Sequence, residues 1–234
     1  MMLVHNHLEY KILFDQNRLN TIIIESPLFM TTYITQLNNQ INGQEGGFIL
    51  SKSPLEELDI SKNMELIINP IIDSTYNKKF ATKLINSIKK LSTSEELYKQ
   101  TVEIQSILLK YASLLTHESN ETLLFTDQID LSSLLKLFNF SLDFEDPSML
   151  ENIISYMKAL NTYTEVKIFA FANIKSYLTH EELLYLYETA TGMKSHLFLI
   201  ENHQQKPFIN KEKCCIIDID LCEIFREGKY EKDP

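Results

Sequence analysis

The most basic stretch of the chain lies between Ser74 and Ser94, which contains five lysines and no acidic residue. The whole chain has a net charge of −10, so this window has the opposite sign. On a helix, Lys79, Lys83 and Lys90 would fall within about 40° of one another. Such a row could contact nucleic-acid phosphates, and the alternative is the solvated face of an amphipathic helix. The candidate DNA-binding residues are Lys78, Lys79, Lys83, Lys89 and Lys90.

A second group of candidates is acidic and could bind a metal ion. Hard cations such as Ca²⁺ take several oxygen ligands from a flexible loop. The spacing of these acids is not that of an EF-hand, and taken alone the stretch favours an exposed acidic turn. The candidate ligands are Glu118, Glu121, Asp127 and Asp130.

The signatures of common enzymes are missing from the sequence. Neither G-x-x-x-x-G-K nor G-x-G-x-x-G occurs, which argues against nucleotide hydrolysis by the usual phosphate-binding loop. Asp218 and Asp220 would share a strand face and could hold Mg²⁺ in a divergent nuclease or NTPase, but a solvated strand end is the favoured interpretation. The three cysteines lack zinc-site spacing, and no G-x-S-x-G elbow is present. We therefore expect a protein that is not an enzyme.

The elements that must position these residues alternate between strand and helix at both ends of the chain. Ser26-Pro27 predicts a helix start, and Thr179 with Glu182 predicts a capping box. The expected strands are 8–14, 21–25, 48–50, 64–69, 166–173, 196–201 and 214–219, and the expected helices are 26–42, 146–160 and 179–191.

The middle of the chain is predicted to be mainly helical. Two helices are expected between Asn77 and His117, and Ser92 with Glu95 has capping-box spacing that should open the second. A helix at 131–137 would lie between short strands at 123–126 and 138–144. Together these patterns predict an α/β fold with a mostly parallel sheet. The sheet domain would comprise residues 1–73 and 150–234, with residues 74–149 inserted as a helical leg.

The composition favours a cytoplasmic protein that does not enter a membrane. No run approaches the roughly 18–20 apolar residues of a membrane helix. Cys214, Cys215 and Cys222 form a poor disulfide framework, which fits a reducing compartment.

The last third of the chain resembles a known family. The segments are Val166-Lys-Ile-Phe-Ala-Phe-Ala-Asn173, Ser176-Tyr-Leu-Thr-His-Glu-Glu182 and His196-Leu-Phe-Leu-Ile-Glu201. They resemble the small CRISPR-associated adaptation protein of type II-A systems, with its apolar strand ending in asparagine, its Tyr-Leu-Thr helix start and its strand ending in Leu-Glu. Length and element order are also similar along most of the chain.

The resemblance implies an architecture and a role in antiviral defense. Members have a P-loop-NTPase-like head without functional Walker motifs, plus a helical leg, and four chains form a homotetrameric ring that loads onto double-stranded DNA ends. Calcium ions held by acidic leg residues maintain the ring, which implicates Glu118, Glu121, Asp127 and Asp130. The family's partners in spacer acquisition are the CRISPR integrase complex and the effector nuclease. Two alternatives to this role are a metal-dependent nuclease or NTPase using Asp218 and Asp220, and a protein-interaction adaptor.

Overall fold

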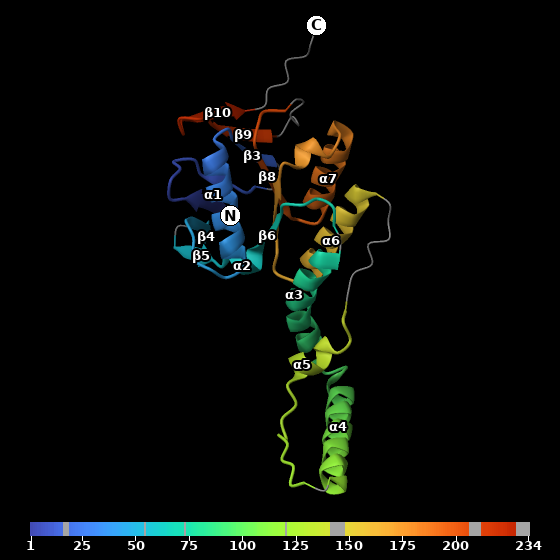
Figure 1. Cartoon of the computed structure of the whole chain (residues 1–234). Helices are drawn as coiled ribbons and strands as arrows, with labels where there is room; N and C mark the ends of the chain where they lie inside the picture. Colours follow the sequence, from blue (N-terminus) through green and yellow to red (C-terminus); the bar gives the residue numbers. More distant parts are fainter. Residues whose placement is uncertain are drawn as a thin grey trace. The chain divides into compact units, whose positions relative to one another are not determined.

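The structure is a computed structural model that describes residues 1–15, 19–53, 55–72, 74–119, 121–140, 148–205 and 212–227. The chain divides into two compact units (Figure 1). The sheet unit comprises Met1–Ile72 and Phe144–Pro234, and the helical unit comprises Asp73–Asp143.

A six-stranded sheet forms the centre of the sheet unit. Its order is β10-β9-β3-β8-β7-β6, and every neighbouring pair is parallel except β10 with β9. The predicted α/β class with a mostly parallel sheet is therefore confirmed. All five residues of β7 are buried, as expected for a parallel strand covered on both faces. The strands are β3 (Leu19–Ile24), β6 (Met64–Ile67), β7 (Ile168–Ala172), β8 (His196–Glu201), β9 (Glu212–Ile217) and β10 (Glu223–Glu227).

A second, antiparallel sheet was not predicted. Its order is β2-β1-β4-β5, formed by β1 (Met2–His5), β2 (Ile12–Leu13), β4 (Phe48–Ser53) and β5 (Glu56–Leu58). The strand expected over residues 8–14 is reduced to β2, because β1 is the strand that pairs with β4.

Helix α1 (Pro27–Ile41) lies between the two sheets and carries much of the core. Its inner face, including Tyr33 and Leu37, packs in one cluster with Ile22 and Phe198 of the large sheet and Leu50 of the small one. The predicted start is confirmed, since the Ser26 hydroxyl accepts a hydrogen bond from the Phe29 amide and Pro27 is the first helical residue. The short α2 (Ile60–Asn63) leads directly into β6.

Helices α6 (Met149–Tyr163) and α7 (His180–Gly192) cover the other face of the large sheet (Figure 1). The predicted capping box of α7 is confirmed, because Thr179 and Glu182 exchange side-chain to backbone hydrogen bonds. Ser148 caps α6, while the expected Asp146-Pro147 start lies outside the described residues. A 3₁₀ turn, η1 (Ile174–Ser176), follows β7.

The helical unit contains α3 (Ser74–Ser92), α4 (Tyr98–Glu118) and α5 (Leu131–Lys136). The expected capping box at Ser92 and Glu95 is wrong. Ser92 is the last residue of α3, where its hydroxyl donates to the Lys89 carbonyl, and α4 begins only at Tyr98 without a side-chain cap. Residues 123–126 are not a strand, nor are 138–140, and the rest of the second expected strand lies outside the described residues.

Candidate functional site

Helix α3 carries all five candidate lysines in one continuous helix. Lys89 and Lys90 are exposed and Lys83 is partly exposed, whereas the side chains of Lys78 and Lys79 lie outside the described part of the structure. On the opposite side of the helix, Phe80 and Leu84 are buried. The helix is therefore amphipathic, with a basic outer side that can meet a polyanion.

The C-terminal end of α3 is tied to α5 within the helical unit. The Lys89 Nζ donates a hydrogen bond to the Ser132 Oγ at 3.3 Å. At the start of α5, the carboxylate of Asp130 accepts hydrogen bonds from the backbone amides of Ser132 and Ser133 and from the Ser133 hydroxyl. These bonds, with the Ser133 hydroxyl contributing most and the Lys89 charge adding to them, lower the pKa of Asp130.

The four candidate calcium ligands do not form a metal site within the described chain. Glu118 ends α4, and the amide of Glu121 donates to the Ser119 hydroxyl. Both oxygens of Asp130 already accept hydrogen bonds as the cap of α5. No three His, Cys, Asp or Glu side chains gather to hold a metal anywhere in the described residues. Within the described residues, one chain therefore does not bring three of these acids together.

Helix α4 has an exposed apolar surface, and the sequence alone did not predict that exposure. None of its 21 residues is buried. The sequence predicted a helix here, but an amphipathic helix is equally compatible with a core position. Side chains exposed by 37% to 67% line the helix: Tyr98, Val102, Ile104, Ile107, Leu108, Tyr111, Leu114 and Leu115. Because single chains rarely expose so large an apolar surface, α4 is a candidate interface.

The alternative metal site at Asp218 and Asp220 is a turn between β9 and β10. The Asp218 side chain accepts a hydrogen bond from the Cys222 amide at 2.8 Å, and the Asp218 amide donates to the Cys222 carbonyl. Asp220 is exposed. Here the first aspartate closes the hairpin, an ordinary structural role for Asp in turns.

A buried group of ionisable residues was missed by sequence reasoning. The Lys175 Nζ lies 2.5 Å from the Glu212 Oε1, which also accepts from the Thr21 hydroxyl. The Lys175 amide donates to the Glu201 Oε1, and Glu201 is only 1% exposed. Burial raises the pKa of Glu201 to about 7, despite the opposing hydrogen bond and charge of Lys175. These residues join η1 to the sheet strands β3, β8 and β9.

Comparison with known protein families gives one match that covers most of the chain. A family model described as "CRISPR-associated protein (Cas_Csn2)" matches residues 40–221. No curated protein matches at a significant level. In the described residues, no helix is both long enough and apolar enough to cross a membrane.

Proposed function

This chain belongs to the Cas_Csn2 family of CRISPR-associated proteins, and from that membership we propose that it binds double-stranded DNA ends as a non-catalytic ring of four chains during spacer acquisition. One feature of the helical unit carries the proposal. The five lysines of α3 are in the same compact unit as α4, a helix that buries none of its residues within the chain. The helical unit thus carries both the lysines of α3, which could contact DNA, and the exposed apolar side chains of α4, which could contact another chain.

Self-association through α4 would cover its exposed apolar side chains. We take a second copy of the chain as the occupant of this apolar surface. Two copies of α4 would then form an isologous interface, in which the same residues of both copies meet. Burial of the apolar side chains would supply the affinity.

Assembly would also resolve the conflict between an acidic chain and a polyanionic ligand. A chain of net charge −10 repels DNA on average, yet binding depends on where the positive charges lie. Four copies of α3 around one opening would bring Lys79, Lys83 and Lys90 of each chain, twelve lysines in all, to a shared surface. Many modest phosphate contacts then sum to a strong, salt-sensitive affinity.

The composition supports contact with phosphates rather than recognition of bases. Arg18 and Arg226 are the only arginines in the chain. Bidentate arginine contacts are the commonest specific contacts to guanine. A lysine-rich, arginine-poor protein is therefore suited to hold duplex DNA of any sequence, in keeping with the capture of varied DNA fragments.

Calcium binding remains a proposal from the family resemblance. Because the described acids of one chain do not gather, the test is whether Ca²⁺ binds at all. Isothermal titration of the intact protein with CaCl₂, with MgCl₂ as the matched control, should give a calcium-specific heat that Glu118→Gln with Glu121→Gln reduces. A flat titration would remove calcium from the proposal.

The proposed assembly is tested by native mass spectrometry of the full chain with and without a short DNA duplex. We expect a tetramer, and a tetramer with one duplex when DNA is added. A strict monomer in both conditions would overturn the ring. A tetramer that takes up no duplex would instead favour a protein-interaction adaptor.

A further inference from the structure

A cavity of about 450 Å³ opens in the sheet unit at the carboxyl ends of the parallel strands. It is lined by the last residue of β3, by Asn173 after β7, by Asn202 after β8 and by the first turns of α1. The connection from β3 leads to β6 at one edge of the sheet, whereas β9 lies on the other side of β3. Such a reversal in strand order is where open α/β sheets bind small ligands. The cavity is unrelated to the lysines of α3.

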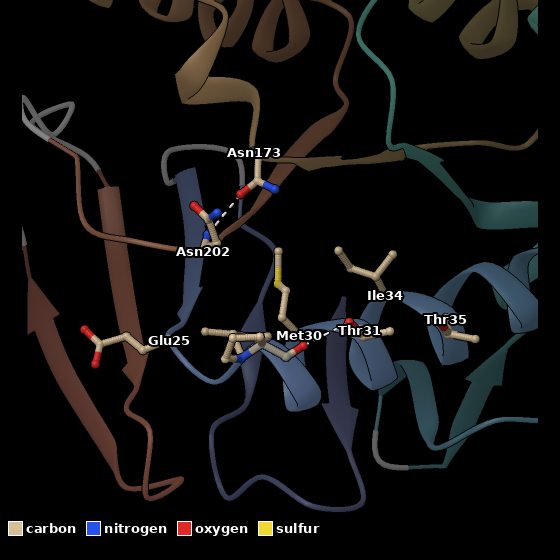
Figure 2. A pocket seen from close by; sticks show the side chains of 9 residues that line it. Glu25, Met30, Thr31, Ile34, Thr35, Asn173 and Asn202 are labelled. Atoms are coloured by element: carbon tan, nitrogen blue, oxygen red, sulfur yellow. Dashed lines mark hydrogen bonds between the residues drawn. The ribbon is translucent and has the colours of Figure 1, made fainter.

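The lining combines an apolar floor with two carboxamides. Met30 and Ile34 of α1 lie on one side and Asn173 and Asn202 on the other (Figure 2). The amide of Asn202 donates to the Asn173 Oδ1 at 3.0 Å, which leaves the Asn173 Nδ2 turned away from that bond. The Asn202 Oδ1 contacts the His203 ring. In the described structure neither amide nitrogen donates to a protein acceptor, so both are available to a ligand.

Backbone geometry holds one of these amides in place. Asn173 has φ of 55° and ψ of 32°, the left-handed conformation that few residues other than Gly and Asn adopt. Its own amide donates to the Ile200 carbonyl. The side chain therefore sits at a fixed point between β7 and β8, where it can serve as a positioned hydrogen-bond donor. Residues in such rarely adopted backbone conformations are often found at ligand-binding sites.

Phosphate is a poor ligand for this cavity, even though it adjoins a helix N-terminus. Pro27 has no amide hydrogen, and the Ser26 hydroxyl already accepts from the Phe29 amide. None of the nine lining residues is Lys or Arg, and Glu25 adds a carboxylate. An anion would thus meet few free donors and a repulsive charge.

A site with two free amide donors and no cation suits a neutral ligand that carries hydrogen-bond acceptors. The ring nitrogens and carbonyl oxygens of a nucleobase are such acceptors, and amide side chains bind base edges in proteins. The Met30 thioether and the Ile34 side chain can pack on a flat ring. The volume is within the usual range for small-molecule pockets. We propose that this cavity binds a neutral, acceptor-bearing heterocycle of nucleoside size and discriminates against its phosphorylated forms.

Saturation-transfer NMR and calorimetry on the intact protein test this site with adenosine and inosine, using ATP, ribose and inorganic phosphate as controls. We expect binding of at least one nucleoside, with ATP at least tenfold weaker, which corresponds to about 1.4 kcal/mol. Ile34→Trp should block the cavity. Asn173→Gly should weaken binding while it keeps the left-handed backbone.

Thr32→Ala provides the matched control, since Thr32 is an exposed residue of α1 outside the cavity. ATP or phosphate binding as tightly as the nucleosides would overturn the proposal. So would the lack of any nucleoside signal at millimolar concentration, or nucleoside binding that survives Ile34→Trp in a folded protein. Loss of DNA binding in another assay would leave this result unchanged, because the two sites share no residue.

Discussion

The Lys175 Nζ lies 2.5 Å from the Glu212 Oε1, and the two side chains are 6% and 0% exposed. The pair links the turn after β7 to the first residue of β9, two segments that are 37 residues apart in the chain. Glu212 gains a further hydrogen bond from the Thr21 hydroxyl of β3. A buried, hydrogen-bonded ion pair of this kind favours one pairing of chain segments over others, although its net contribution to the free energy of unfolding is small.

Removing one partner of this pair should destabilise the sheet unit strongly. Lys175→Met leaves a buried carboxylate uncompensated, so we expect a loss of about 3–5 kcal/mol in the free energy of unfolding. Chemical denaturation followed by circular dichroism measures it. Lys158→Met, an exposed lysine on α6, is the control and should change stability by less than about 0.5 kcal/mol. Equal effects of the two substitutions would refute the buried pair.

The protonation of Glu201 should make stability depend on pH. Burial raises its pKa from 4.5 to about 7, so between these values the folded state retains a proton that the unfolded state has lost. The contribution of Glu201 to the free energy of unfolding is therefore largest at low pH and falls as pH rises through this window, by at most about 3 kcal/mol.

Glu201→Gln isolates this contribution, because it is neutral at every pH. The difference in unfolding free energy between wild type and Glu201→Gln should shift in favour of the variant from about pH 5 to about pH 8. Denaturant titrations at both pH values give the difference. A difference that stays constant with pH would show that Glu201 is ionised throughout.

Polar substitution on α4 should break the assembly without unfolding the chain. No residue of α4 is buried within one chain, so Ile107→Asp with Leu114→Asp removes only apolar surface that a second copy would cover. Native mass spectrometry should show a smaller species, with an unchanged helical signal in circular dichroism. Glu103→Gln on the same helix is the control. An intact tetramer in the double variant would place the interface elsewhere.

Charge reversal on α3 should weaken duplex binding and its salt dependence together. With Lys79, Lys83 and Lys90 changed to Glu, we expect the slope of log affinity against log salt to fall by about one unit per lysine removed in each contacting chain. Fluorescence anisotropy with a labelled duplex at several salt concentrations measures both quantities. The same reversal at Lys11, Lys158 and Lys194 of the sheet unit is the matched control, and a loss of binding there instead would move the DNA surface off α3.

Much of the secondary structure of the sheet unit could be predicted, because helix caps and apolar strands are specified by residues close together in the sequence. The cap of Ser26 with Pro27, the Thr179–Glu182 capping box and the continuous apolar strand ending at Asn173 each specify an element within a few residues. The order of the strands could not be predicted, since β3 pairs with β8 and β9, which follow it in the chain only after 171 and 187 intervening residues. The antiparallel sheet was missed because its strands β1, β2 and β5 are only two to four residues long and were not recognised as strands with those bounds.

The candidate site was less predictable than the fold. The lysines of α3 were evident because charge is visible in a sequence, whereas the ion pair of Lys175 and Glu212 depends on a contact between distant segments. The sequence predicted that α4 is a helix. It could not predict that the apolar side chains of α4 are exposed, because core helices and interface helices have the same apolar periodicity. Asp130 was predicted as a metal ligand, but in the structure its carboxylate accepts hydrogen bonds from the backbone amides at the start of α5.

The proposed entry of DNA into a closed ring from its ends can be tested with one duplex in two topologies. Affinity is measured for a linear duplex and for the same sequence as a covalently closed circle, at equal salt. We expect tight, length-dependent binding to the linear form, weak binding to the circle, and recovery of binding when the circle is cut once. Equally tight binding to the uncut circle would contradict it.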